Sequence, residues 1–137
     1  KRFKPGKAYK DSKLCNMITV QEIAKRFSSE KIICNSLYPG CVAKTQLFRS
    51  TPWIFRIFFP IFQRFITGGY VSERIAGERV ALIATGSEYT QSGVHWSWGN
   101  RQKLGRKAFS QKLSERIIDP TTSEKLWELS KKLVGLC

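Results

Sequence analysis

The stretch Lys31-Ile-Ile-Cys-Asn-Ser-Leu-Tyr-Pro-Gly40 decides how this chain folds. It opens with a short run rich in β-forming side chains, and Pro39-Gly40 ends that run in a tight turn, so we expect a strand and turn over 31–41. Before it, apolar residues recur at helical spacing from Met17 to Phe27, which predicts an amphipathic helix over 7–28. A long helix that leads into an apolar strand is half of a parallel βαβ unit, so the sequence predicts an α/β fold.

The chain after the Pro-Gly turn shows further periodic segments. In the helix expected after Gly69, Val71, Ile75, Val80 and Ile83 are predicted to face inward. Thr121-x-x-Glu124 is a capping box, which predicts the start of the last helix. The remaining expected elements are a segment over 44–67, a helix over 70–85, a strand over 93–98, a basic loop from Gly99 to Arg106 and a last helix over 122–135.

The run from Trp53 to Phe65 is crowded with aromatic and isoleucine side chains around Pro60, with Arg56 and Arg64 as its only charges. It is shorter than the ~20 residues that a helix needs to span a bilayer. Three interpretations remain open: a core helix, an interfacial segment, or a hydrophobic lid over a pocket. The cationic and aromatic character favours the last two.

The charge balance is strongly basic. The 137 residues carry 24 Lys and Arg against 10 Asp and Glu, a formal charge of +14. Such a balance attracts polyanions, so one alternative is a non-catalytic module that binds anionic membrane or nucleic acid through Lys1 to Lys13 and Arg101 to Arg116. No recognised nucleic-acid motif accompanies the charge. The cysteines are irregularly spaced and His95 has no ligand cluster beside it, so we predict no metal site.

The sequence Tyr9-Lys-Asp-Ser-Lys13 places a phenol and an ammonium four residues apart near the start of the first helix. Side chains at i and i+4 share a helix face, so the two polar groups are expected to converge. A nearby cation stabilises a tyrosine phenolate, and a lysine ammonium can also donate hydrogen bonds to ribose hydroxyls. By itself the Y-x-x-x-K pattern is a weak signal, and a surface Tyr beside a surface Lys is the better explanation for it.

The order helix, strand and Pro-Gly places the turn at the carboxyl end of a strand, where open α/β sheets bind ligands. With the Y-x-x-x-K pair, this order resembles the short-chain dehydrogenase/reductase family. The resemblance implies NADPH as cofactor, with Tyr9 and Lys13 serving catalysis and the nicotinamide ribose. It also implies that Pro39 and Gly40 lie against the nicotinamide ring and that Thr45 contacts the cofactor.

The sequence also resembles one particular group within the short-chain dehydrogenase/reductase family. Five segments together resemble the light-dependent NADPH:protochlorophyllide oxidoreductases, and the cyanobacterial forms above all. They are Gly6 to Met17, Ser36 to Ala43, Phe65 to Ser72, Ser92 to Gln102 and Lys132 to Leu136. The resemblance implies an enzyme that reduces the C17=C18 bond of protochlorophyllide in the light, for chlorophyll synthesis. Another short-chain reductase, acting on a carbonyl, is the alternative that the Leu-Tyr-Pro-Gly-Cys and Trp-Ser-Trp segments disfavour.

The same resemblance implies roles for further residues. Tyr9 is the expected proton donor, Cys41 matches the family's active-site cysteine, and Tyr38 and Phe48 are expected to line the pigment. The aromatic run corresponds to a lid over a flat macrocycle. Cys15 also matches a family cysteine, although a buried structural thiol is an equal alternative.

A short-chain reductase holds the pyrophosphate of its dinucleotide with a Gly-rich turn, and no G-x-G-x-x-G pattern occurs in the sequence. We therefore expect the C-terminal part of one Rossmann-like doubly wound domain, without its N-terminal dinucleotide-binding half and inactive in isolation. The expected partner is protochlorophyllide, with membrane-surface association and homo-oligomers allowed and no specific nucleic acid. The expected location is the cyanobacterial cytoplasm or a thylakoid or plasma membrane surface, or the plastid in a eukaryote.

Overall fold

A computed structural model describes residues 2–43, 49, 51–99 and 104–136, with the side chains of 104–106 excepted. The chain divides into two compact units. The first comprises Lys1–Ser36, Gln91–His95 and Gln111–Cys137, and the second comprises Leu37–Thr90 and Trp96–Ser110. Helices and a small sheet occur together, so the predicted α/β class is confirmed.

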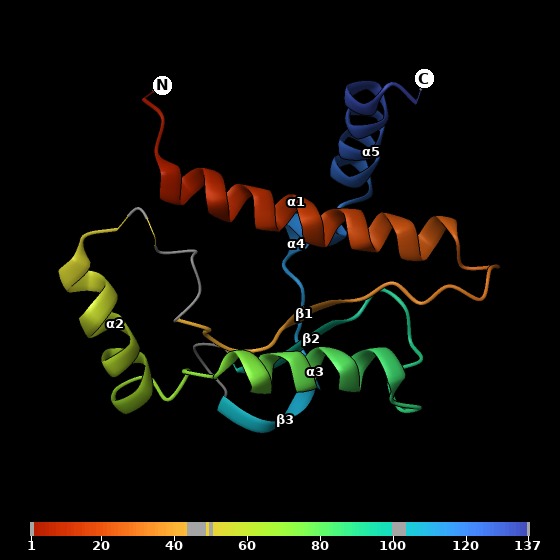
Figure 1. Ribbon diagram of the computed structural model, residues 1–137. Coiled ribbons are helices and arrows are strands. Elements are labelled where there is room, and N and C mark those ends of the chain that lie inside the picture. Colours follow the sequence, from red (N-terminus) through yellow and green to blue (C-terminus); the bar gives the residue numbers. More distant parts are fainter. Residues whose placement is uncertain (1, 44–48, 50, 100–103, 137) are drawn as a thin grey trace. The chain divides into compact units, whose positions relative to one another are not determined.

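The first unit is built on helix α1, Pro5–Arg26. Pro5 occupies the first helical turn, where its fixed φ suits a helix and its missing N–H costs nothing. The basic residues Lys25 and Arg26 in the last turn complement the negative end of the helix dipole. Two further helices, α4 (Glu115–Ile118) and α5 (Pro120–Val134), contact α1, as Figure 1 shows.

Helix α5 begins at a different cap from the one predicted. Asp119 is its N-cap, and the Asp119 carboxylate accepts hydrogen bonds from the backbone N–H groups of Thr121 and Thr122. The predicted capping box at Thr121 and Glu124 is therefore wrong. Pro120 explains the difference, because a proline directly after an aspartate sets the first helical turn two residues earlier.

The chain after α1 joins a sheet through a strand shorter than expected. Strand β1 covers Ser36–Tyr38 only. Just before it, backbone N–H groups bond to side chains where a regular strand pair would use backbone carbonyls. The Cys34 N–H donates to Ser92 Oγ (3.0 Å), and the Val94 N–H donates to Asn35 Oδ1 (2.9 Å). Ser36 N–H then bonds the Val94 carbonyl, so regular pairing begins there. Residues 34 to 36 bond in order to residues 92 to 94, so the two segments run in the same direction and are parallel.

The second unit contains most of a three-stranded sheet with the order β1-β2-β3. Strand β2 is His95–Gly99, and its antiparallel partner β3 is Leu104–Ser110. The expected basic loop through Arg106 is wrong, because β3 begins at Leu104 and pairs with Gly99. The exposed Lys107 on β3 suits the place of this strand at the edge of the described sheet, where a charge discourages pairing with another chain.

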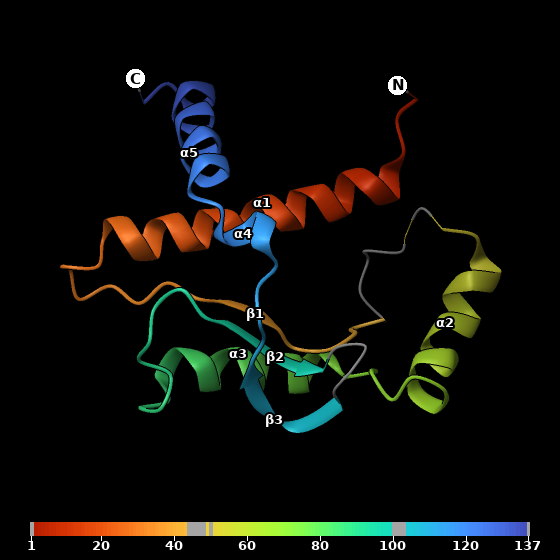
Figure 2. The same ribbon diagram turned by 180° about the vertical axis from the view of Figure 1, so that it is seen from behind.

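Helix α3, Glu73–Thr85, lies beside β2 and β3 in Figure 2. Its N-cap is Ser72, whose hydroxyl accepts the N–H of Ile75 at 3.2 Å. Val71 is buried and Ile83 is partly buried, as predicted, but Ile75 and Val80 are exposed, so that part of the prediction is wrong. The inner face instead carries the partly buried residues Ala76, Arg79 and Ile83. A long arginine stem can cover apolar surface in place of an aliphatic residue.

Helix α2, Trp53–Phe65, includes Pro60 in its interior and buries none of its residues. The core of the second unit lies elsewhere, in Ala43, Val71, Tyr89 and Trp98. The core-helix interpretation of this run is therefore wrong, and the interfacial and lid interpretations remain. Within the described part of the chain, every helix is too short or too polar to cross a membrane.

Candidate functional site

The Tyr9 and Lys13 side chains lie together on the N-terminal half of α1. The Lys13 Nζ is 5.6 Å from the centroid of the Tyr9 ring, which is the convergence that the i, i+4 spacing predicts. Tyr9 is 46% exposed, and Lys13 is exposed. Asp11 forms an ion pair with Lys7 on the same helix. The nearest acid along the helix is therefore engaged with another lysine, and both polar groups of the Tyr9–Lys13 pair face solvent.

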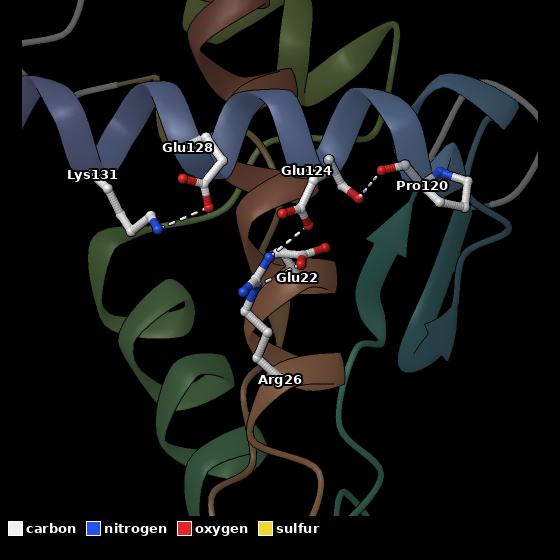
Figure 3. Close-up of polar contacts among 7 residues, drawn as sticks. Glu22, Arg26, Pro120, Glu124, Glu128 and Lys131 are labelled. Carbon is white, nitrogen blue, oxygen red and sulfur yellow. Dashed lines mark hydrogen bonds and ion pairs between the residues drawn. The ribbon is translucent and has the colours of Figure 1, made fainter. Parts of the chain in front are cut away.

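A polar cluster fixes the other half of α1 to α5. Arg26 Nε donates to Glu22 at 2.6 Å and Arg26 Nη2 donates to Glu124 at 2.6 Å (Figure 3). The Arg26 guanidinium also lies 4.9 Å from the centroid of the Trp127 ring. Glu22 is only 2% exposed. Burial raises the pKa of Glu22, but hydrogen bonds from Ser123 and Arg26 outweigh it, and the net pKa is lowered. The carboxylate therefore stays charged in place, and it anchors the helix that carries Tyr9 and Lys13.

A second contact holds α1 against the segment before β2. Gln21 Nε2 donates to the carbonyl oxygen of Gly93 at 2.6 Å. Gly93 adopts a φ of +79°, and a Cβ there would come within 3.3 Å of the Ala24 side chain. Only glycine fits both the conformation and the close approach without strain. The end of α1 is thus fixed on two sides.

The Pro39-Gly40-Cys41 turn is fixed by backbone pairing with a remote segment. The Cys41 N–H donates to the Gly69 carbonyl at 2.8 Å, and the Val71 N–H donates to the Cys41 carbonyl at 3.0 Å. Cys41 thereby forms a parallel bridge with Tyr70. Gly40 has a φ of +115°, which L side chains rarely adopt, so the turn requires glycine.

The two titratable groups of this turn favour their neutral forms. Burial raises the pKa of the Cys41 thiol. Burial also raises the pKa of Tyr38, with a smaller contribution from Cys41. Both side chains therefore carry their protons at neutral pH. A protonated thiol can donate a hydrogen bond or a proton, whereas a thiolate would act as a nucleophile or metal ligand.

Arg79 is a residue at the turn that the sequence interpretation missed. Its guanidinium donates to the Pro39 carbonyl oxygen and lies 5.1 Å from the centroid of the Trp98 ring. Burial lowers the pKa of Arg79. The sequence pattern contained one usable signal: Ala76, Arg79 and Ile83 share a helical spacing, with the arginine in the middle of an inward stripe.

The structure thus brings the predicted site residues together in two groups. Tyr9 and Lys13 form one group, in the first unit, and the segment from Tyr38 to Cys41 forms the other, in the second unit. Thr45 and Phe48, predicted to contact cofactor and pigment, lie outside the described residues.

His95 and Cys15 take no part in either group. His95 is buried, its Nδ1 is 2.8 Å from Ser36 Oγ, and burial lowers its pKa. Cys15 is exposed, so the alternative of a buried structural thiol is wrong. Among the described residues, no group of three or more His, Cys, Asp or Glu side chains is placed to hold a metal ion.

Comparison with known proteins places these residues in a family context. No protein-family model matches the chain. Over 135 residues, 98% of its length, the chain is 50% identical to protochlorophyllide reductase B of Oryza sativa subsp. japonica and 51% identical to protochlorophyllide reductase of Cucumis sativus. It is 47% identical over 135 residues to the enzyme of Marchantia paleacea. All three are named as chloroplastic. The predicted resemblance to protochlorophyllide reductases is therefore confirmed.

The similarity covers only part of these relatives. The matched region makes up 33% of the Oryza and Cucumis proteins and 29% of the Marchantia protein. The chain spans about a third of the length of the curated relatives it matches.

Proposed function

We propose that this chain is part of a light-driven, NADPH-dependent protochlorophyllide reductase, and that it supplies the Tyr-Lys pair and the Pro-Gly-Cys turn of the catalytic site. The observation that carries the proposal is the identity of about half the residues over 98% of the chain. The local geometry supports it, because Tyr9 and Lys13 converge in solvent and the turn is rigidly held.

The donor groups present suit the nicotinamide-ribose end of NADPH. Lys13 offers an exposed ammonium with hydrogen-bond donors for ribose hydroxyls, and Tyr9 offers a hydroxyl beside it. Pro39 and Gly40 form a rigid turn on which a flat ring can rest. The sequence has no Gly-rich turn for the pyrophosphate, so the rest of a Rossmann-like domain would hold that end.

NADPH, when bound, supplies the hydride for the reduction. The protein must then deliver a proton to the neighbouring carbon and orient the pigment. Tyr9 is the proposed proton donor, and Lys13 stabilises the phenolate that the proton transfer leaves. Cys41 keeps its proton because of burial, so it can donate a hydrogen bond to the pigment or act as a second proton source. Tyr38, half exposed beside it, contributes to the pigment side.

Helix α2 has two proposed roles: it contacts a membrane surface, or it forms a lid over the pigment. Its aromatic side chains are widely exposed, for instance Trp53 at 68% and Phe58 at 62%. From 31 to 72 the sequence has basic residues and no Asp or Glu. Exposed aromatics with flanking arginines suit the interface of an anionic bilayer. Flotation with anionic vesicles tests this: Phe58→Glu should reduce binding, whereas Phe58→Leu should keep it.

A chimera tests the proposed activity. In it, this chain replaces the 135 aligned residues of the Cucumis sativus enzyme. We expect the chimera to consume protochlorophyllide with NADPH in the light and to remain inactive in the dark. We expect Tyr9→Phe to remove most of the rate, because the variant keeps the ring and loses the acidic proton. A folded chimera without photoreduction would refute the proposal.

A further inference from the structure

Arg79 is a partly buried cation whose partners are a carbonyl oxygen and an aromatic face. The ion pairs found among the described residues join Lys7, Arg26, Arg74 and Lys131 to acids, and none of them includes Arg79. The acid next to it in the sequence, Glu78, pairs with Arg74 at 2.8 Å on the exposed side of α3. Partial burial removes some of the hydration of a cation, and no acid among the described residues offsets that cost for Arg79, so its carbonyl and aromatic contacts must offset it.

The contacts of Arg79 converge on one turn. Its guanidinium donates to the Pro39 carbonyl oxygen, and a Cβ on Gly40 would lie 3.2 Å from Arg79 Nη1. The guanidinium carbon of Arg79 also lies 5.1 Å from the ring centroid of Trp98, which is 5% exposed and belongs to β2. The cation therefore contacts both the Trp98 indole and the turn, a combination of aromatic contact and hydrogen bond that arginine makes better than lysine.

The turn is consequently fixed at both ends. Backbone bonds to Gly69 and Val71 hold Cys41, and Arg79 holds the carbonyl just before Gly40. Gly40 itself, at a φ of +115°, has no side chain to limit its motion. Removing the Arg79 contact would leave the Pro39-Gly40 peptide restrained from one side only.

We propose that Arg79 is a positioning residue: it fixes the Pro39-Gly40 turn and thereby sets the placement and the access of Cys41. For its effect on catalysis, this inference rests on the proposed function, because the turn matters there only if it meets cofactor and pigment. The placement of Cys41 itself does not depend on that function. Arg79 acts through the turn and is not proposed to touch substrate.

The test compares Arg79→Met and Arg79→Lys with Arg74→Met in the chimera. Arg74 is the matched control, since it lies on the same helix, is exposed and pairs only with Glu78 among its described contacts. Iodoacetamide alkylation is followed by peptide mass spectrometry at Cys41, at the exposed Cys15 and at the partly buried Cys34. Cys15 gives the intrinsic rate, and Cys34 in the first unit reports general unfolding.

We expect Arg79→Met to accelerate alkylation of Cys41 by about 10- to 100-fold, the range that corresponds to losing one hydrogen bond from a charged donor, with Cys34 unchanged. Arg79→Lys should fall between, because lysine can donate to Pro39 but cannot stack on Trp98 as a plane. Arg74→Met should match the unmodified chimera. Unchanged Cys41 alkylation in both Arg79 variants would overturn the proposal, and so would equal acceleration at Cys34 and Cys41, which would mark a merely structural role.

Photoreduction kinetics separate this inference from the proposed function. If both hold, Arg79→Met should raise the KM for NADPH and lower kcat, and Arg79→Lys should restore part of each. If the unmodified chimera is folded but inactive, the proposed function fails, while selective acceleration at Cys41 still supports the positioning role of Arg79. If the chimera is active and the Arg79 variants keep its alkylation pattern, the positioning role fails and the function stands.

Discussion

Replacing Gly40 with alanine should damage the Pro-Gly-Cys turn for two separable reasons. The first is conformational: an L residue at a φ of +115° is strained, which costs about 1–3 kcal/mol. The second is steric: the new Cβ would lie 2.8 and 2.9 Å from the two methyl groups of Val71. Val71 is buried and cannot move freely, and overpacking of this kind costs about 1–3 kcal/mol. Gly40→Ala should therefore destabilise the protein by about 2–6 kcal/mol, the sum of the two costs.

Two other glycines separate these costs. Gly135 has a φ of +75° with open space where a Cβ would lie, so Gly135→Ala carries conformational strain alone, about 1–2 kcal/mol. Gly77 lies inside α3 with nothing near its Cβ position, so Gly77→Ala should stabilise by about 0.5–1 kcal/mol. Urea unfolding of the chimera, followed by circular dichroism, measures all three.

A double-mutant cycle isolates the steric part. Val71→Ala removes the methyl groups that the new Cβ meets, so Gly40→Ala should cost about 1–3 kcal/mol less in the Val71→Ala background than alone. The reasoning would be refuted if Gly40→Ala cost no more than Gly135→Ala, or if the cycle showed no coupling with Val71.

Three further predictions concern α1 and the segment that it contacts. Tyr9→Phe in the chimera should lower the photoreduction rate about 10²-fold or more with normal folding, and an unchanged rate would exclude Tyr9 as proton donor. Glu22→Gln should lower the free energy of unfolding by about 1–3 kcal/mol, because Ser123 and Arg26 lose a charged acceptor, while the exposed Glu78→Gln should change it by less than about 0.5 kcal/mol; equal effects would contradict the anchoring role. The folded-state pKa of His95 is lowered by burial, so the unfolded chain binds its proton more readily and stability should fall as pH drops below about 6.5. His95→Gln should weaken the dependence of the melting temperature on pH between about pH 5 and 7. If the variant shows the same pH dependence as the unmodified protein, that would count against a buried neutral imidazole.

The features that the sequence predicts best are those set by residues close together in the chain. The α1 helix and the convergence of Tyr9 with Lys13 depend on residues a few positions apart, and the structure has both. Strand β3 was missed because its partner β2 stabilises it, and its own basic sequence shows no alternation. Asp119 and Pro120 set the start of α5, and the Thr121-x-x-Glu124 pattern alone does not show that a cap two residues earlier is the one used.

Non-local contacts explain the rest of what sequence could not predict. The inner face of α3 includes Arg79, and its helical spacing with Ala76 and Ile83 does not by itself show what the arginine contacts. Only the fold shows that Trp98 and the Pro39 carbonyl lie within its reach. The burial that keeps Cys41 protonated is likewise a property of packing, since neighbouring residues in the sequence carry no sign of it.

The central claim is that these 137 residues supply a working Tyr-Lys pair and Pro-Gly-Cys turn to a protochlorophyllide reductase. Its most direct measurement is single-flash photoreduction by the chimera with bound NADPH and protochlorophyllide, followed by absorbance against a dark control. The account predicts light-dependent, NADPH-dependent conversion of the pigment that Tyr9→Phe slows by about 100-fold or more. A folded, pigment-binding chimera that converts nothing in the light, or one that Tyr9→Phe leaves fully active, would contradict it.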